Sequence, residues 1–196
     1  MAEVGLGLGA NLGDRGAAII SALQALDAMA SVRLTALSGV YRSAPWGITD
    51  QPDFLNMAAL IETDLPPLEA LRTVKALELA SGRRVRERWG PREIDIDLLF
   101  YDDLELASGE LILPHPGLFQ RRFVLAPLVE ISPDRLIRGR TPLQGLLELP
   151  GEDKGDVVLD LLETHHLALA FPGRTAPTRA GDRQSRRPTA WDGSEP

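Results

Sequence analysis

The sequence of 196 residues contains no cysteine, which excludes a disulfide framework and any metal site built from thiolates. It also lacks an apolar run long enough to span a bilayer, and its N-terminus lacks the basic and hydrophobic regions of a signal peptide. The length suits one domain with its own core. We therefore expect a soluble, untargeted protein that works in the reducing cytoplasm.

Lysine is almost absent, since only Lys75 and Lys154 occur, and the P-loop pattern G-x-x-x-x-G-K-[ST] occurs nowhere. The net charge of −7 argues against general nucleic-acid binding, because proteins that bind duplexes present a basic surface to the phosphates. The positive charge is instead concentrated locally, in arginines.

The strongest local signal lies in residues 83–97, which read R-R-V-R-E-R-W-G-P-R-E-I-D-I-D. Asp95 and Asp97 alternate with isoleucines, and this period of two places both carboxylates on one face of a strand. Two neighbouring carboxylates repel each other unless a cation lies between them, and such a pair suits Mg²⁺ that also binds substrate phosphates. A solvated ion-pair edge is the alternative interpretation, which the nearby arginines and the W-G-P turn make the weaker one.

Arginine is the residue that grips phosphate oxygens with two parallel hydrogen bonds, whereas lysine acts as a point charge. The same stretch contains five arginines, namely Arg83, Arg84, Arg86, Arg88 and Arg92. The cluster therefore predicts binding of a phosphate-rich ligand next to the two aspartates.

The remaining patterns predict an α+β chain in the order β-α-β-β-α-β, which is compatible with a ferredoxin-like fold. Residues 172–196 have no apolar period and are expected to form a disordered tail. Strands are expected at 3–9, 32–42, 54–62 and 94–101, a hairpin partner of the last strand from 104, and helices at 15–30, 66–80, 120–131 and 142–149.

Two further groups of residues suggest ligand contacts. Phe54 and Asn56 share one face of a strand and could stack on a flat heterocycle and hydrogen-bond its edge, although a core phenylalanine beside a satisfied asparagine is an equal alternative. His115 lies between two prolines in a rigid turn, and Arg121 and Arg122 follow it. The nearby arginines favour a phosphate contact of His115 over a purely structural role.

Five motifs together resemble one family, 6-hydroxymethyl-7,8-dihydropterin pyrophosphokinase (2-amino-4-hydroxy-6-hydroxymethyldihydropteridine diphosphokinase) of folate biosynthesis. They are G-A-N-L-G-D at 9–14, Y-R-S-A-P-W-G at 41–47, D-Q-P-D-F-L-N at 50–56, R-W-G-P-R-E-I-D-I-D at 88–97 and P-H-P at 114–116. The W-G-P-R-x-x-D-x-D segment is very specific to that family.

The resemblance implies a ferredoxin-like βαββαβ core in which an antiparallel sheet carries helices on one face. It also implies transfer of pyrophosphate from ATP to the hydroxymethyl group of the pterin, with release of AMP and the help of two Mg²⁺ ions. A monomer is expected, with the pyrophosphokinase domain over residues 1–171.

The resemblance also assigns residues to the site. The implied catalytic residues are Arg83, Arg92, Asp95 and Asp97, of which Asp95 and Asp97 hold the metals. ATP would contact Arg83, Arg84, Arg86, Arg92, Leu98, His115 and Arg121. The pterin would contact Ser43, Ala44, Trp46, Phe54, Asn56, Trp89, Asp95 and Phe123.

Two departures from the family pattern qualify these assignments. The loop arginine that contacts phosphate is either Arg84 or Arg86, because the spacing after Gly82 differs from the common one. Gly117 stands where the family often has a larger polar or basic residue, so one nucleotide contact is in doubt.

Two rival functions fit parts of the pattern. Another two-metal nucleotidyl transferase would also place two carboxylates on a strand, but it gives no reason for Phe54 and Asn56. A ferredoxin-like RNA-binding module would stack bases on sheet aromatics, but the acidic balance and the missing K/R-G-F/Y-G/A-F motif count against it.

Overall fold

The computed structural model describes residues 1–45, 48–84, 90–150 and 157–176. Within these ranges, no helix is long and apolar enough to cross a membrane. The strands are β1 Ala2–Ala10, β2 Val32–Leu37, β3 Tyr41–Ser43, β4 Phe54–Thr63, β5 Asp95–Tyr101, β6 Leu106–Ala107, β7 Ile112–Leu113 and β8 Val157–Leu159. The helices are α1 Arg15–Asp27, α2 Pro67–Ala80, α3 Arg122–Ile131, α4 Pro142–Glu148 and α5 Leu161–Ala170, and a 3₁₀ turn, η1, spans Leu118–Gln120.

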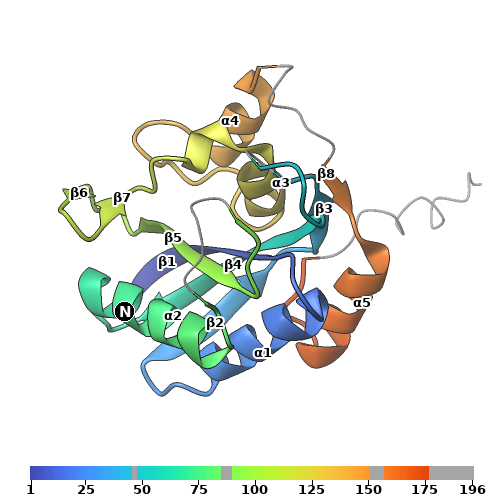
Figure 1. Cartoon of the computed structure of the whole chain (residues 1–196). Coiled ribbons are helices and arrows are strands. Elements are labelled where there is room, and N and C mark those ends of the chain that lie inside the picture. The colour runs from blue at the N-terminus through green and yellow to red at the C-terminus, as the bar shows by residue number, and fades with distance from the viewer. Residues whose placement is uncertain (46–47, 85–89, 151–156, 177–196) are drawn as a thin grey trace, which may run out of the picture.

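The main sheet is antiparallel and has the order β5-β1-β4-β3-β8, with β2 also paired to β4 (Figure 1). Strands β1 and β4 form its centre, in register from Ala2 opposite Thr63 to Ala10 opposite Leu55. Strand β5 pairs only with β1, so its other edge is free of strands among the described residues. That outer edge is where the charged residues gather.

Helices cover both faces of the sheet, contrary to the expectation of helices on one face. Figure 1 shows α1, α2 and α5 on one side and α3 with α4 on the other. Leu6 and Leu8 of β1 pack with the first group in one core, whereas Leu99 of β5 packs with Leu125 and Leu128 of α3 in a second core. The pattern at 120–131 does predict a helix, but sequence periodicity does not say which face of a sheet a helix covers.

The predicted strand at 32–42 is split into β2 and β3, because the chain bends at Ser38 and Gly39. The Ser38 hydroxyl is buried, accepts a hydrogen bond from the amide of Ala58 at 2.9 Å and donates one to the carbonyl of Gly39 at 2.7 Å. A β-carbon on Gly39 would lie 2.6 Å from the Cδ1 atom of Leu159, so the leucine side chain of β8 occupies the space that a larger residue would need.

The predicted hairpin partner of β5 is wrong. After β5 the chain turns at Asp102, whose φ is 42° and which exchanges hydrogen bonds with Glu3 of β1. The outer edge of β5 is reached instead by His115, whose amide donates to the carbonyl of Leu99 at 2.8 Å. Strand β6 pairs with β7 in a separate small sheet.

The segment from β8 to Ala176 was not predicted. It includes residues 172–176, which the composition assigns to the disordered tail but which lie against β2: the carbonyl of Arg174 accepts from Leu37, and Ala176 donates to Leu37. Residues 177–196 of the expected tail lie outside the described residues. Helix α5 exposes several leucines, such as Leu161, Leu162 and Leu169, whereas Leu167 is fully buried. The leucines on both faces hide the apolar periodicity of this helix in the sequence.

Helix α5 also holds the bend before β3. The Thr164 hydroxyl accepts a hydrogen bond from the amide of Val40 at 2.9 Å, and the amide of Asp160 donates to the carbonyl of Val40 at 2.7 Å. Asp160 in addition pairs with Arg42 of β3 at 2.6 Å. The C-terminal helix therefore braces the strand that carries Ser43.

We expect Thr164→Val to destabilise the protein by about 1 to 3 kcal/mol, because the buried amide of Val40 loses its acceptor. Urea unfolding measures the change. Thr164→Ser keeps the hydroxyl and serves as the control, with stability close to that of the parent. A loss in Thr164→Ser together with a Thr164→Val variant as stable as the parent would show that the methyl group, and not the hydrogen bond, matters.

Candidate active site

A cavity of about 660 Å³ opens beside the outer strand β5 and is lined by β1, β3, β4, β5, α2, residues 83–84 and 90–92, and the start of α3. Gly7 and Gly9 lie opposite Asp97 and Asp95 in the β1–β5 ladder and belong to the lining. Because these two positions have no side chain, the central strand leaves room above the sheet for a ligand.

The expected alternation along β5 is confirmed. Asp95 and Asp97 both line the cavity, whereas Ile96 and Leu98 are buried in the core on the opposite face. This geometry also places Leu98, one of the residues expected at the nucleotide, away from the cavity. Its side chain packs in the core under the sheet.

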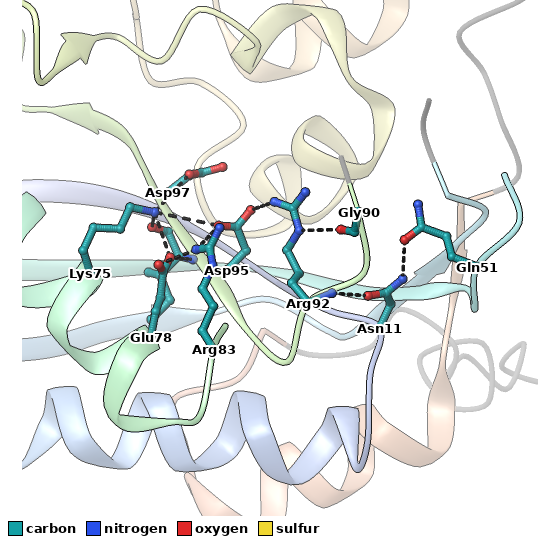
Figure 2. Close-up of polar contacts among 10 residues, drawn as sticks. Asn11, Gln51, Lys75, Glu78, Arg83, Gly90, Arg92, Asp95 and Asp97 are labelled. Atoms are coloured by element: carbon teal, nitrogen blue, oxygen red, sulfur yellow. Dashed lines mark hydrogen bonds and ion pairs between the residues drawn. The ribbon is translucent and has the colours of Figure 1, made fainter. Parts of the chain in front are cut away.

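Asp95 is held by two arginines from the neighbouring segment (Figure 2). Its Oδ1 accepts from Arg83 Nη1 at 2.6 Å, and its Oδ2 accepts from Arg92 Nη1. Burial acts to raise the pKa of Asp95, but the positive charges of Arg92, Lys75 and Arg83 outweigh burial and hold the pKa below its ordinary value. Asp95 is therefore an anion at neutral pH.

Two residues of α2, which the sequence patterns did not single out, complete this ion-pair network. Glu78 is buried and accepts from Lys75 Nζ at 2.7 Å, from the amide of Ile96 at 2.6 Å and from Arg83. Burial raises the pKa of Glu78 despite the opposing charge of Lys75. Lys75 Nζ also donates to the carbonyl of Ile96 at 3.0 Å. Together they satisfy both free backbone groups of Ile96, which protects this edge.

Asn11, at the end of β1, ties two loops together (Figure 2). It is buried, accepts from the amide of Arg92 at 2.8 Å and donates from Nδ2 to Gln51 Oε1 at 2.9 Å and to the carbonyl of Pro52 at 3.0 Å. The loop before Phe54 and the segment that carries Arg92 are thus fixed relative to each other. The motif G-A-N-L-G-D contains this asparagine, but a turn assignment alone does not predict its partners.

The other end of the cavity is less charged. Phe54, Asn56 and Ser43 line it together, and Asn56 Nδ2 donates to the Ser43 hydroxyl at 2.9 Å. The guanidinium carbon of Arg92 lies 5.9 Å from the centre of the Phe54 ring, and that of Arg121 lies 5.9 Å from the centre of the Phe123 ring. Each aromatic ring therefore has a cation beside it.

The structure brings together most of the expected site residues. Those at the cavity are Ser43, Ala44, Phe54, Asn56, Arg83, Arg84, Arg92, Asp95, Asp97, Arg121 and Phe123. Trp46, Arg86 and Trp89 lie outside the described residues, so the choice between Arg84 and Arg86 stays open even though Arg84 lines the cavity.

His115 is not part of the cavity lining. Burial lowers the pKa of His115, and the charge of Asp97 opposes this shift while that of Arg121 supports it. The imidazole is therefore neutral at neutral pH, and its Nδ1 accepts from the amide of Gly117 at 3.0 Å. A β-carbon on Gly117 would lie 2.9 Å from the guanidinium carbon of Arg121, so Arg121 fills space that a larger residue would need.

The cavity as a whole is positive. Among the described residues, its lining contains three carboxylates, those of Glu78, Asp95 and Asp97, and five basic side chains, Lys75, Arg83, Arg84, Arg92 and Arg121, which leaves two positive charges. No cluster of three or more potential metal ligands occurs among the described residues. The pair Asp95 and Asp97 nevertheless fits Mg²⁺, which keeps several waters and is bound by one or two carboxylates together with substrate phosphates.

Known proteins resemble this chain in sequence. A family model described as 7,8-dihydro-6-hydroxymethylpterin-pyrophosphokinase matches residues 5–133. The chain is 44% identical over 149 residues to the 2-amino-4-hydroxy-6-hydroxymethyldihydropteridine pyrophosphokinase of Methylorubrum extorquens, which covers 76% of this chain and 94% of that protein. The corresponding protein of Pseudomonas aeruginosa is 40% identical over 158 residues, with coverages of 76% and 98%.

A solved structure with a similar fold is that of wild-type HPPK-DHPS from Plasmodium falciparum with STZ-DHP, at a TM-score of 0.60 and 14% identity. The match covers 75% of this chain and 43% of that one. At this identity the likeness concerns the fold alone.

The network around Asp95 leads to a prediction on stability and pH. Since the pKa of Asp95 is lower in the folded protein than in the unfolded chain, its stabilisation is fully present above about pH 4 and is lost as the pH falls through the lower, folded value. We expect Asp95→Asn to destabilise the protein at pH 7 by roughly 1 to 3 kcal/mol and the difference from the parent to shrink below about pH 4.

Urea unfolding from pH 3 to pH 8, an interval of about one unit below to four above the ordinary aspartate pKa, measures this difference. Asp103→Asn is the matched control, because Asp103 is 92% exposed and lies outside the cavity. A difference for Asp95→Asn that does not depend on pH would contradict the assignment of its ion pairs.

Proposed function

The chain belongs to the 7,8-dihydro-6-hydroxymethylpterin-pyrophosphokinase family, and from this premise we propose how its cavity performs the family's reaction. The protein is an ATP-dependent pyrophosphokinase of folate biosynthesis, which transfers pyrophosphate from ATP to 6-hydroxymethyl-7,8-dihydropterin and releases AMP. One observation supports the assignment of the site. A single cavity contains the arginines that bind Asp95 and, at its other end, the aromatic and amide side chains of Phe54 and Asn56.

The cationic end binds the triphosphate. Arg83 and Arg92 offer planar guanidinium groups that suit two-point contacts to phosphate oxygens, and Arg121 lines the same cavity. The surplus of two positive charges among the described lining residues favours an anionic ligand such as the triphosphate. His115, which is also expected to contact ATP, would present a neutral imidazole to it.

The other end binds the pterin. Phe54 and Phe123 supply flat apolar surfaces for the bicyclic ring, and Asn56 presents an amide that can bond the edge of the ring. The hydrogen bond from Asn56 to Ser43 fixes the amide orientation before the substrate arrives. The hydrogen bond of Asn56 to Ser43 is therefore compatible with a role of Phe54 and Asn56 in ligand binding.

Asp95 and Asp97, which both line the cavity, are the residues that would hold the two Mg²⁺ ions when ATP is bound. When bound, the ions supply neutralisation of the charge that develops on the phosphates during transfer. Binding of a metal by Asp95 competes with its ion pairs to Arg83 and Arg92, each of which occupies one acceptor site on an Asp95 oxygen. The triphosphate is the competitor that draws these guanidinium groups away.

The reaction then needs orientation more than covalent chemistry. The pterin hydroxyl attacks the β-phosphorus, the bond to the α-phosphate oxygen breaks, and AMP leaves with that oxygen. The residues of the chain hold the two substrates in line, and Arg83 and Arg92 stabilise the charge on the transferred group. No intermediate bonded to the protein is required.

The fold of the core supports a ferredoxin-like arrangement. The order β5-β1-β4-β2, with α1 after β1 and α2 after β4, is that of a βαββαβ unit if β3 is treated as a continuation of β2. The boundary of the domain near residue 171, a monomeric state and a cytoplasmic location stay predictions.

The assay that tests the function is release of AMP from ATP in the presence of Mg²⁺ and 6-hydroxymethyl-7,8-dihydropterin. The result expected is AMP release that depends on the pterin, and none with a 6-methyl pterin that lacks the attacking hydroxyl. AMP or pyrophosphate release without any pterin would instead favour a nucleotidyl transferase.

We expect Asp97→Ala to abolish turnover while the fold survives, because this carboxylate is 35% exposed and forms an ion pair with Lys75. The AMP assay and a melting curve measure the two effects. Asp103→Ala, in a turn outside the cavity, is the control that retains activity. A folded Asp97→Ala variant with near-normal activity would remove Asp97 from the mechanism.

A further inference from the structure

Lys75 lies where a cation would neutralise both aspartates of β5. Its Nζ is 3.8 Å from Asp95 Oδ1 and 3.7 Å from Asp97 Oδ1, so one positive charge faces both carboxylates (Figure 2). It is one of two lysines in the chain, and arginine supplies the other permanent cations of the lining. A compact ammonium group at this point resembles a metal ion more closely than a planar guanidinium group does.

The Lys75 ammonium group is anchored by groups other than the two aspartates. Nζ donates to Glu78 at 2.7 Å and to the carbonyl of Ile96 at 3.0 Å, and the Glu78 side chain is only 3% exposed. These short contacts fix Nζ, whereas the distances to the two aspartates are those of ion pairs without a direct hydrogen bond. The ammonium group is thus held beside the carboxylates and leaves their oxygens accessible from the cavity.

We propose that Lys75 is a positioning residue that neutralises Asp95 and Asp97 in the nucleotide-free enzyme and thereby weakens their affinity for divalent cations. A cation that binds the two carboxylates alone is repelled by the charge of Lys75 at close range. Phosphate oxygens of ATP add negative charge to the same place, which outweighs this repulsion. Metal and nucleotide then bind together, and the aspartates do not hold a metal without substrate.

This inference rests on the proposed metal-binding role of Asp95 and Asp97. A structural role of Lys75 is the competing explanation, since the side chain also covers the outer edge of β5 through Ile96. The two explanations differ in what removal of the charge does. A purely structural lysine affects stability, whereas a positioning lysine also sets the affinity for metal.

The test is the affinity of the nucleotide-free protein for Mn²⁺, measured by titration calorimetry or by the electron paramagnetic resonance signal of free Mn²⁺. Lys75→Gln removes the charge but keeps an amide donor for Ile96, and Lys75→Met removes both. We expect both variants to bind Mn²⁺ about tenfold more tightly than the parent. Lys75→Arg retains the charge, and we expect its affinity to stay near that of the parent.

Arg72→Met is the matched control, because it removes one positive charge from the same helix at a residue that is 66% exposed and pairs with Glu110. Its Mn²⁺ affinity is expected to stay unchanged, and melting curves report the stability of every variant. An unchanged or weaker Mn²⁺ affinity in both folded Lys75→Gln and Lys75→Met would overturn the proposal. The measurement uses neither ATP nor pterin, so a failed pyrophosphokinase assay and a failed metal titration are separate outcomes.

A second titration repeats the measurement with a non-hydrolysable ATP analogue bound. The advantage of Lys75→Gln over the parent should then fall to less than about threefold, since the phosphates offset the charge of Lys75 in both proteins. An advantage that stays as large as without nucleotide would contradict the part of the proposal that couples metal to nucleotide.

Discussion

The outer edge of β5 is the constraint on which the rest of the site depends. Asp95 is mostly buried there, and burial of a carboxylate is unfavourable unless cations and donors compensate for the lost water. Arg83, Arg92 and Lys75 provide that compensation, while Glu78 binds the backbone of Ile96 and keeps two of these cations in place. In the proposed mechanism, the cations that compensate Asp95 are also those that bind the triphosphate, so stability and substrate binding depend on one set of groups.

The ion pairs of Asp95 give the cavity a defined structure. In the proposed mechanism these pairs are exchanged when the nucleotide binds, and phosphate oxygens replace the carboxylate oxygens as acceptors. Asn11 keeps the Arg92 segment attached to the loop before Phe54 during this exchange. The nucleotide end and the pterin end of the cavity are thereby connected through short hydrogen bonds at the end of β1.

Much of the site could be predicted from local patterns. The period of two placed Asp95 and Asp97 on one face correctly, and Arg83, Arg84 and Arg92 of the arginine cluster line the same cavity. Lys75, Glu78 and Asn11 could not be assigned partners, because their partners come from distant segments and an i,i+3 pair on a helix is usually a surface feature. Similarly, no periodicity indicates that α3 covers the face opposite α1, or that β8 and α5, beyond the range matched by the family model, brace β3.

The central claim is that Arg83 and Arg92 exchange Asp95 for phosphate when the substrates bind. A crystal structure of the complex with Mg²⁺, a non-hydrolysable ATP analogue and 6-hydroxymethyl-7,8-dihydropterin tests it most directly. The account predicts both guanidinium groups within hydrogen-bond distance of phosphate oxygens and the oxygens of Asp95 turned to the metals. A complex in which Asp95 keeps both arginines, with the metals bound elsewhere, would contradict it.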